Sequence, residues 1–583
     1  MNPFLSGIEA VLWLVLLWNA APVLRGRTHD PVTRVRNALL LGIAIPFALG
    51  LVHALYGPAC WLAVLVLCYV ARRRLTRLAA DGSSDSETNL WLFLPVVVVC
   101  VVAMPSLLEP QIEGDTLIYH LPNAAAWAQS GTLWTTGTRY WWFPGGSELF
   151  AAGLLSVGGW WAVGLSGAVA AALLGLRLAA WSVAIGAPRW AGALIASAFV
   201  ATPVVAAQTG DLRNDVWLAA LFVESLWSLR QRDGEVPALA ATAVTKPIGP
   251  IFALICAIVG RARLGYVAAG IPLLLWLARD AILWRSADVP PASTLYPVWG
   301  TMILAHGWIG IGVLGSALWQ AGLATFAWCV LPLVGLFVPS VRAQAAAGML
   351  ASGVFLLYPF GFENNLPQLA TGESLRYDMP GMATGALVAA ALAARAPLVL
   401  STLAGAAFLV GMRAWLSIFW NDPITHRSPL IVCALAIGVA LAPSRARRLA
   451  ISAACAVLVV FASLESSSRA APFYDAHMPA ASGAPTRLYE WLQSFPPRSV
   501  VLENARAGSL AMTSPRTAVG DAAGPNACDE ARRRGALLIV GSSDVQPAPL
   551  DQTRFARARA CGRVLYGDAA ALVIEPRWTR LLR

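Results

Sequence analysis

The sequence predicts a mainly α-helical protein, a polytopic membrane helix bundle that carries a small α/β domain at its C-terminal end. Hydrophobic residues make up 58% of the 583-residue chain, and its mean hydropathy is +0.64. Charged residues make up 13%, against roughly 25% in an ordinary soluble domain. Apolar runs of about 17–25 residues, the length that crosses a bilayer as helix, recur along the chain. Because lipid cannot hydrogen-bond the backbone, these continuous runs should be helical.

The predicted helices follow one another along most of the chain. Their expected ranges are 5–24, 37–56, 58–71, 91–107, 161–183, 189–206, 213–230, 235–246, 247–260, 264–284, 322–339, 344–360, 378–394, 398–418, 428–442 and 449–466. The apolar stretch 298–316 is either another span or an interfacial helix. We expect N-terminal helices in residues 1–90, a transmembrane core in 91–466 with a large external loop at 108–160, and the α/β domain in 467–583.

Arginines orient the bundle, because short cytoplasmic loops carry an excess of positive charge. With the helix ranges above, every arginine cluster falls on one side, which should be the cytoplasm. The arginines concerned are Arg25, Arg27, Arg34, Arg36, Arg72, Arg73, Arg74, Arg77, Arg230, Arg232, Arg261, Arg263, Arg342, Arg395, Arg445, Arg447 and Arg448. The same assignment explains the net charge of +11 without a nucleic-acid partner. The loop 108–160 and the chain after residue 467 should lie on the opposite side.

The C-terminal segment differs in pattern from the rest of the chain. It predicts a helix at 485–494 and strands at Ser499–Leu502, Ala536–Val540 and Ala570–Ile574. Cys528 and Cys561 are its only cysteines. A non-cytoplasmic compartment is oxidising, so they either form a disulfide or remain two separate thiols.

The external loop contains the first candidate site. Asp115 follows an apolar run directly and is flanked by Glu113 and His120, so it is a candidate general base just above the membrane surface. The alternative is that Asp115 caps a helix that begins at Thr116. Tryptophans farther along the loop either mark the depth of the lipid headgroups or form a platform for sugar rings or lipid. These are Trp127, Trp134, Trp141 and Trp142.

Two further candidates lie between predicted spans on the same side. Asp211 and Asp215 are four residues apart and would share one helical face, unless one of them caps the helix that follows. Lys246 is the only lysine of the chain and lies in an apolar region before Pro247. A charge there indicates function by default, although a snorkelling lysine is the alternative.

Basic residues beside aromatic residues form the last group. Arg279 precedes Asp280, and Arg376 precedes Tyr377, both on the predicted external side. Arginine offers bidentate hydrogen bonds that suit a phosphate, here the phosphate of a lipid. Arginines that bind phosphate cannot be distinguished from other interfacial arginines by sequence alone.

The order of these motifs resembles that of GT-C glycosyltransferases over residues 90–395. The resemblance begins with Asp115-x-x-x-Tyr119-His120-Leu121-Pro122 in the first external loop. It continues through Trp142-Phe143-Pro144-Gly145-Gly146-Ser147-Glu148, Asn214-Asp215, Thr245-Lys246-Pro247, Arg279-Asp280, Tyr296-Pro297 and Arg376-Tyr377-Asp378-Met379-Pro380. The bacterial members akin to protein O-mannosyltransferases and lipid A aminoarabinose transferases are the most similar. Two departures are the three spans that precede the family's usual first helix and Asp280, where asparagine is expected.

The resemblance implies a GT-C-like fold in the bacterial inner membrane with a periplasmic C-terminal domain. It implies a polyprenyl-phosphate-linked sugar as donor, a glycan, lipid or protein as acceptor, and Asp115 as the catalytic carboxylate. Asp211 or Asp215 would supply a second acidic group. Asp115 would deprotonate the acceptor while Lys246, Arg279 and Arg376 neutralise the leaving phosphate, with inversion at the anomeric carbon. A divalent cation between Asp115 and Asp211 or Asp215 is compatible with these ligands, but no motif demands a cofactor.

Two other functions are compatible with a polytopic membrane protein. A secondary transporter would place ionisable residues near the bilayer midplane between repeated halves, and no repeat is present in this sequence. A non-catalytic scaffold for envelope polysaccharide assembly would not need an external carboxylate beside an intramembrane lysine. Convergence of the carboxylates and cations at one site would favour the enzyme over both alternatives.

Overall fold

The computed structural model describes the following residues of the chain: 3–24, 30–79, 90–108, 116–159 except 137 and 139, 163–261, 263–284, 325, 327–357, 372–397, 400, 404, 491, 494, 500–503, 519–521, 527–541, 549–567 and 571–577. Asp115 and Glu113 lie outside these ranges, as do the predicted span 298–316 and nearly all of the predicted helices between 398 and 466.

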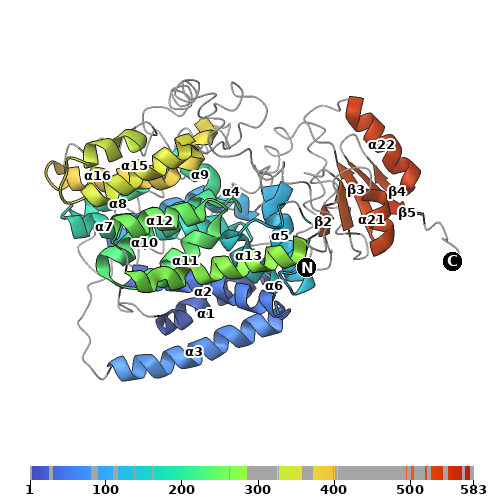
Figure 1. Ribbon diagram of the computed structural model, residues 1–583, viewed down its shortest axis with the longest axis horizontal. Helices are drawn as coiled ribbons and strands as arrows, with labels where there is room; N and C mark the ends of the chain where they lie inside the picture. Colours follow the sequence, from blue (N-terminus) through green and yellow to red (C-terminus); the bar gives the residue numbers. More distant parts are fainter. Residues whose placement is uncertain are drawn as a thin grey trace.

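Helices form the body of the described chain, as predicted (Figure 1). In chain order they are α1 (Pro3–Ala20), η1 (Ala21–Val23), α2 (Pro31–Leu51), α3 (Gly57–Ala79), η2 (Leu90–Leu92), α4 (Phe93–Leu108), η3 (Thr116–His120), α5 (Leu121–Ser130), α6 (Gly146–Ser156), α7 (Leu165–Ile185), α8 (Arg189–Val200), α9 (Pro203–Thr209), α10 (Asp215–Gln231), α11 (Glu235–Thr245), α12 (Gly249–Val259), η5 (Leu264–Gly270), α13 (Ile271–Trp284), α15 (Arg342–Leu357), η7 (Gly372–Asp378) and α16 (Met379–Ala393).

Several of these helices are suited to a bilayer. Within the described residues, the helical stretches Leu5–Val23, Pro31–Leu51, Leu165–Ile185 and Tyr266–Leu283 are long and apolar enough to cross it. Outer helices also expose large apolar side chains, as lipid-facing surfaces do, among them Leu62, Leu254, Ile258 and Leu274. The chain is therefore a multi-pass membrane protein.

The first arginine cluster differs from its prediction. Helix α2 begins at Pro31 rather than at residue 37, because the Asp30 side chain accepts hydrogen bonds from the backbone N–H groups of Val32 and Thr33. Arg34 and Arg36 therefore lie inside the helix instead of in a loop. Arg36 is buried and its guanidinium donates to the Ser228 hydroxyl at 2.7 Å.

Proline divides two of the predicted segments. The expected break before Pro247 is confirmed, since α11 ends at Thr245 and α12 begins at Gly249. The range 189–206 was expected to be one helix, and this is wrong. It forms α8 and α9, which are separated at Thr202 because Pro203 has no N–H to continue the helix.

The external loop 108–160 has more secondary structure than expected. It contains the single π-helical turn η3 and the short helices α5 and α6. Two hydrogen bonds join its central part to the end of α2: Leu133 N to Gly50 O at 3.0 Å, and Trp134 Nε1 to Leu51 O at 2.8 Å. These helices are too short to give the long apolar pattern from which spans are predicted.

A five-stranded sheet forms the C-terminal domain, with the order β2-β1-β3-β5-β4. Its strands are β1 (Val500–Glu503), β2 (Val519–Asp521), β3 (Leu537–Gly541), β4 (Gly562–Gly567) and β5 (Ala571–Pro576). β1 is parallel to β2 and β3, whereas β5 is antiparallel to β3 and β4. The three predicted strands are confirmed as β1, β3 and β5. The prediction missed β2 and β4. Of the predicted helix 485–494, only residues 491 and 494 are described, and both are helical.

The two faces of this sheet have different neighbours. Leu538 and Val540 pack with the helices α21 (Ala527–Arg534) and α22 (Pro549–Cys561) on one face. Leu537 and Ile539, on the other face, belong to the same buried cluster as the core of the helix bundle. Strand β2 also contacts α5, and Figure 1 shows the sheet beyond α5 at one end of the bundle.

A disulfide joins the two cysteines of this domain, which decides between the two alternatives above. Cys528 in α21 and Cys561 at the end of α22 are bonded, with their Cα atoms 5.9 Å apart. The bond links the two helices on one face of the sheet.

Candidate active site

Lys246 lies in the interruption between α11 and α12. Its backbone is extended, with φ −155° and ψ 157°, and its carbonyl accepts a hydrogen bond from Gly249 N at 2.7 Å. The side chain is buried. Pro247 thus ends α11 so that a buried lysine stands at the end of a helix.

Asp215 is the partner of this lysine. Lys246 Nζ donates a hydrogen bond to Asp215 Oδ1, and the Nε of Arg376 lies 3.9 Å from Asp215 Oδ2. Asp215 is the first residue of α10, where the helix dipole favours a negative charge. It does not cap α10 through its side chain, because the N-cap residue is Asn214 and no cap hydrogen bond forms there.

Arg376 and Tyr377 approach from η7. Arg376 Nη2 donates to the Tyr377 hydroxyl at 2.8 Å, and the guanidinium carbon lies 4.8 Å from the centre of that ring. Lys246 Nζ lies 4.7 Å from the same ring centre. Two cations therefore share one aromatic ring and one carboxylate.

Asp211 belongs to a different contact. It lies in the turn before α10, where Arg213 N donates to its Oδ1 at 2.9 Å and Arg213 Nε to its Oδ2 at 2.7 Å. The prediction that Asp211 and Asp215 share a helical face is wrong, because α10 begins only at Asp215. Arg213 was not predicted as a site residue, although the short Asp-x-Arg spacing allows this local pair.

The same turn contacts the segment that follows Asp115. Leu212 N donates a hydrogen bond to Thr116 Oγ1 at 3.3 Å. A helical turn does begin at Thr116, as the capping alternative for Asp115 requires. Because Asp115 precedes Thr116 in the chain, the contact attaches its neighbour to the turn between Asp211 and Asp215.

His120 and Glu148 form a buried pair. His120 Nδ1 lies 2.6 Å from Glu148 Oε1, and Ser147 Oγ donates to Glu148 Oε2 at 2.7 Å. The ring of Tyr119 packs 4.0 Å from that of His120, and Pro122 is buried in the first turn of α5. The partner of His120 that the structure shows is thus Glu148, which the sequence motif placed 28 residues later.

A close approach of two helices brings this pair toward Lys246. A Cβ atom added at Gly146, at the start of α6, would lie 3.2 Å from the Cα of Thr245. Glycine thus allows the start of α6, which holds Glu148, to pack against the end of α11, which precedes Lys246. The motifs around residues 120, 148 and 246 therefore lie in one region.

Arg279 has other partners than those expected. Its guanidinium donates to Asp280 Oδ1 at 2.6 Å and to three backbone carbonyls of the external loop. These are Leu133 O at 2.8 Å, Trp141 O at 3.0 Å and Thr135 O at 3.3 Å. Since four hydrogen bonds already hold it, Arg279 is better suited to fix the loop than to bind a phosphate.

A second charged network lies near the middle of α10. Arg177 Nε donates to Glu224 Oε1 at 2.7 Å, and both side chains are fully buried. Arg177 also donates to Thr33 Oγ1 at 3.3 Å, and Asp30 lies 3.5 Å away. The sequence analysis did not identify this network, although charged residues inside the apolar runs 165–185 and 215–231 could have indicated it.

The structure gives no support to a particular metal. Among the residues that it describes, no three His, Cys, Asp or Glu side chains are grouped so as to hold a metal ion. The carboxylates expected to bind a divalent cation include Asp115, which lies outside the described ranges. A divalent cation therefore stays a prediction.

Comparison with known proteins yields a distant structural likeness. No protein-family model and no curated protein matches the sequence. Two crystal structures of ArnT from Cupriavidus metallidurans are similar in arrangement. The one bound to undecaprenyl phosphate is 15% identical, with a TM-score of 0.46 over 84% of this chain and 98% of that chain. The one in the apo state is 16% identical, with a TM-score of 0.42 over 83% of this chain and 97% of that chain. Since both TM-scores are below 0.5, the likeness assigns no ligand or activity to this chain.

Proposed function

We propose that this chain is an integral membrane glycosyltransferase of the GT-C type that moves a sugar from a polyprenyl-phosphate donor to a periplasmic acceptor. The observation that carries the proposal is the convergence of Lys246, Arg376 and Asp215. They come from the end of α11, from η7 and from the start of α10, and the hydrogen-bonded contacts bring them to one end of the bundle.

The pairing of a lysine with an arginine at one site suits a lipid-linked phosphate. A phosphate between Lys246 and Arg376 would receive charge-assisted hydrogen bonds, with the bidentate geometry supplied by arginine. Asp215 would keep the lysine in place between turnovers. Because Lys246 is buried, Arg376 is only partly exposed and both are held by the protein, they would stabilise the leaving phosphate with little reorganisation.

Asp115 is the proposed general base. The acceptor oxygen would attack the anomeric carbon and lose its proton to the Asp115 carboxylate, while the bond from that carbon to the phosphate oxygen breaks. Polyprenyl phosphate would leave with the electron pair, and the configuration of the sugar would invert. The hydrogen bond between Leu212 and Thr116 supports this role, because it holds the residue after Asp115 against the turn that leads to Asp215.

We further propose the bacterial inner membrane as the location, with the C-terminal domain in the periplasm. The described contacts are consistent with the arginine-based orientation. Arg36, on the predicted cytoplasmic side, contacts the Asp233 carbonyl beyond the end of α10. Asp215, at the start of the same helix, lies with the proposed site. The domain limits 1–90, 91–466 and 467–583 belong to this proposal.

Mass spectrometry of the glycolipids and glycans of the cell tests the proposed reaction. Cells that lack the protein, and cells that carry only the Asp115→Asn variant, should both lose one glycosylated product and accumulate a polyprenyl-phosphate sugar. Restoring the wild-type chain should reverse both changes. Identical glycolipid and glycan profiles in all strains would contradict a glycosyltransferase and favour a transporter or a scaffold.

A further inference from the structure

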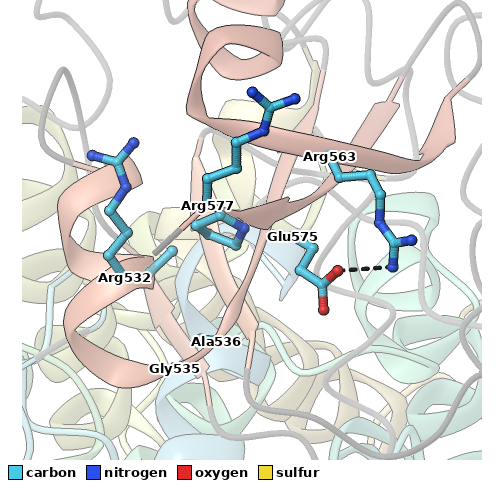
Figure 2. Close-up of a pocket in the computed structure, with 8 residues that line it drawn as sticks. Arg532, Gly535, Ala536, Arg563, Glu575 and Arg577 are labelled. Carbon is cyan, nitrogen blue, oxygen red and sulfur yellow. Dashed lines mark hydrogen bonds and ion pairs between the residues drawn. The ribbon is translucent and has the colours of Figure 1, made fainter. Parts of the chain in front are cut away.

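A pocket in the C-terminal domain has three arginines in its lining. Its volume is about 550 Å³, within the range of roughly 300–1,000 Å³ that is usual for small-ligand sites. It lies where the start of β3, the start of β4 and the end of β5 meet, beside α21. Arg532, Arg563, Arg577 and Glu575 supply its charged lining (Figure 2).

Positive charge exceeds negative charge in this pocket. Three arginines line it against one glutamate, and Arg563 Nη2 pairs with Glu575 Oε2 at 2.9 Å. Arg532 pairs with Asp529, whose carboxylate is 3.0 Å away. Figure 2 shows Arg532 and Arg577 extending in the same direction, whereas Arg563 turns toward Glu575. Among the residues that the structure describes here, three arginines stand against Glu575 and Asp529, a difference of one positive charge.

Arg532 has a hydrogen-bond donor that a ligand could use. Its Nε–H is buried and has no hydrogen-bond partner among the described residues. A buried donor without a partner costs free energy, which a bound acceptor would recover. Its Nη2 donates to the carbonyl of Cys561 at 3.3 Å, and Arg577 N donates to the same carbonyl at 3.1 Å. Because Cys561 is disulfide-bonded to Cys528, the disulfide fixes the backbone between the two arginines.

We propose that this pocket binds an oxyanion, a phosphate or carboxylate carried by a sugar-sized molecule. Planar guanidinium groups match both anions through paired N–H donors. The volume leaves room for a sugar ring beside the charged group. A soluble sugar phosphate and an anionic lipid headgroup present the same chemistry. The site is separate from Lys246 and does not depend on the proposed sugar transfer.

Calorimetric titration of glucose 1-phosphate into the full chain in phosphatidylcholine nanodiscs tests the pocket. Wild-type protein should bind it saturably. Arg577→Ala and Arg532→Gln should each weaken the affinity by about tenfold or more, since each removes a charge-assisted donor. Arg557→Ala, an exposed arginine of α22 outside the lining, should bind as wild type does. If Arg532→Gln reduces folding, Arg577→Ala alone still decides, because its side chain is exposed.

Two further arms make the outcome specific. The double variant Lys246→Ala/Asp215→Asn, which leaves no unpaired buried carboxylate, should retain the binding. If it abolishes the binding while Arg577→Ala does not, the phosphate binds at the candidate active site and the pocket proposal is wrong. Absence of saturable binding by wild-type protein, in discs with or without phosphatidylglycerol, would also overturn it. Competition by phosphatidylglycerol that disappears in Arg577→Ala would identify a lipid headgroup as the ligand, and binding without such competition would identify a soluble one.

Discussion

Lys246 donates a hydrogen bond to Asp215, and this contact ties the end of α11 to the first turn of α10. The pair is buried, and Arg376 lies near the other oxygen of the same carboxylate at 3.9 Å. One acidic group therefore positions two basic groups that come from separate parts of the chain. This relationship allows folding and donor binding to be tested separately.

Lys246→Ala should weaken the binding of polyprenyl phosphate by about tenfold or more, since a charge-assisted hydrogen bond to phosphate is lost. It should also destabilise the fold, by about 3–5 kcal/mol if breaking the buried pair has its usual effect. The double variant Lys246→Ala/Asp215→Asn should recover much of that stability and none of the affinity, because it removes the unpaired carboxylate but restores no cation. Arg395→Ala, an exposed arginine beyond the far end of α16, is the matched control. Donor affinity that returns with stability would leave Lys246 with a structural role only.

Asp115→Asn should leave a folded protein that binds donor but transfers sugar about 10²–10⁴ times more slowly, the usual contribution of a general base. Asparagine caps helices about as well as aspartate, so the capping alternative predicts normal activity. Transfer by purified protein, with polyprenyl-phosphate sugar extracted from the same cells, measures the difference. Asp233→Asn, beyond the opposite end of α10, should be fully active. Near-normal transfer by Asp115→Asn would refute the assignment.

Arg279→Ala should loosen the external loop, because it removes hydrogen bonds to the carbonyls of Leu133, Thr135 and Trp141. Amide hydrogen exchange should accelerate across residues 131–142, and sugar transfer should fall as the loop loses its order. Arg376→Ala should instead weaken donor binding while exchange in this loop stays as in wild type. If amide exchange in the loop is unchanged in Arg279→Ala while donor affinity is lost, Arg279 binds the phosphate rather than fixing the loop.

Loss of the disulfide should affect the C-terminal domain selectively. Cys528 and Cys561 are 33 residues apart, and closing a loop of this length stabilises by about 3–4 kcal/mol in the chain-entropy model. Cys528→Ser/Cys561→Ser should therefore make this domain sensitive to protease at temperatures where the helix bundle resists it. Reductant should do the same to wild type and nothing more to the variant. If the wild type and the variant resist protease equally, both with and without reductant, the domain does not need the bond.

The predicted orientation places the end of the chain in the periplasm. A reporter that is active only in the cytoplasm should therefore be silent when it is fused after Arg583. The same reporter fused after Arg232 should be active, since that arginine belongs to a predicted cytoplasmic cluster. A strong signal after Arg583 would reverse the orientation of the bundle.

Local chemistry made part of the candidate site predictable. Proline cannot continue a helix, so Pro247 predicted the interruption that places Lys246 at a helix end. The resemblance and their shared side led us to expect Lys246 near Arg376 and Tyr377, and both cations lie against the Tyr377 ring. The continuous apolar run of β3 likewise predicted a strand, and the structure buries both of its faces.

Contacts between residues far apart in the chain were harder to predict from the sequence. His120 and Glu148 are brought together by the packing of α5 on α6, and nothing in the spacing of the two residues specifies it. Arg279 has the composition of a phosphate ligand, yet loop carbonyls occupy its donors. Such outcomes depend on which groups lack a partner after the chain has packed, a property of the fold that sequence patterns do not contain.

The buried pair between Arg177 and Glu224 has a consequence for the biogenesis of the protein. Each residue lies within a helix that must enter the bilayer, and an arginine at the centre of an inserted helix costs about 2.5–3.5 kcal/mol on insertion scales. Helix α7 is synthesised before α10, so Thr33 and Asp30 at the start of α2 are the described partners open to Arg177 until Glu224 is made. Early packing of α7 against the start of α2 would therefore lower the cost of inserting Arg177, and the later arrival of Glu224 would complete the network.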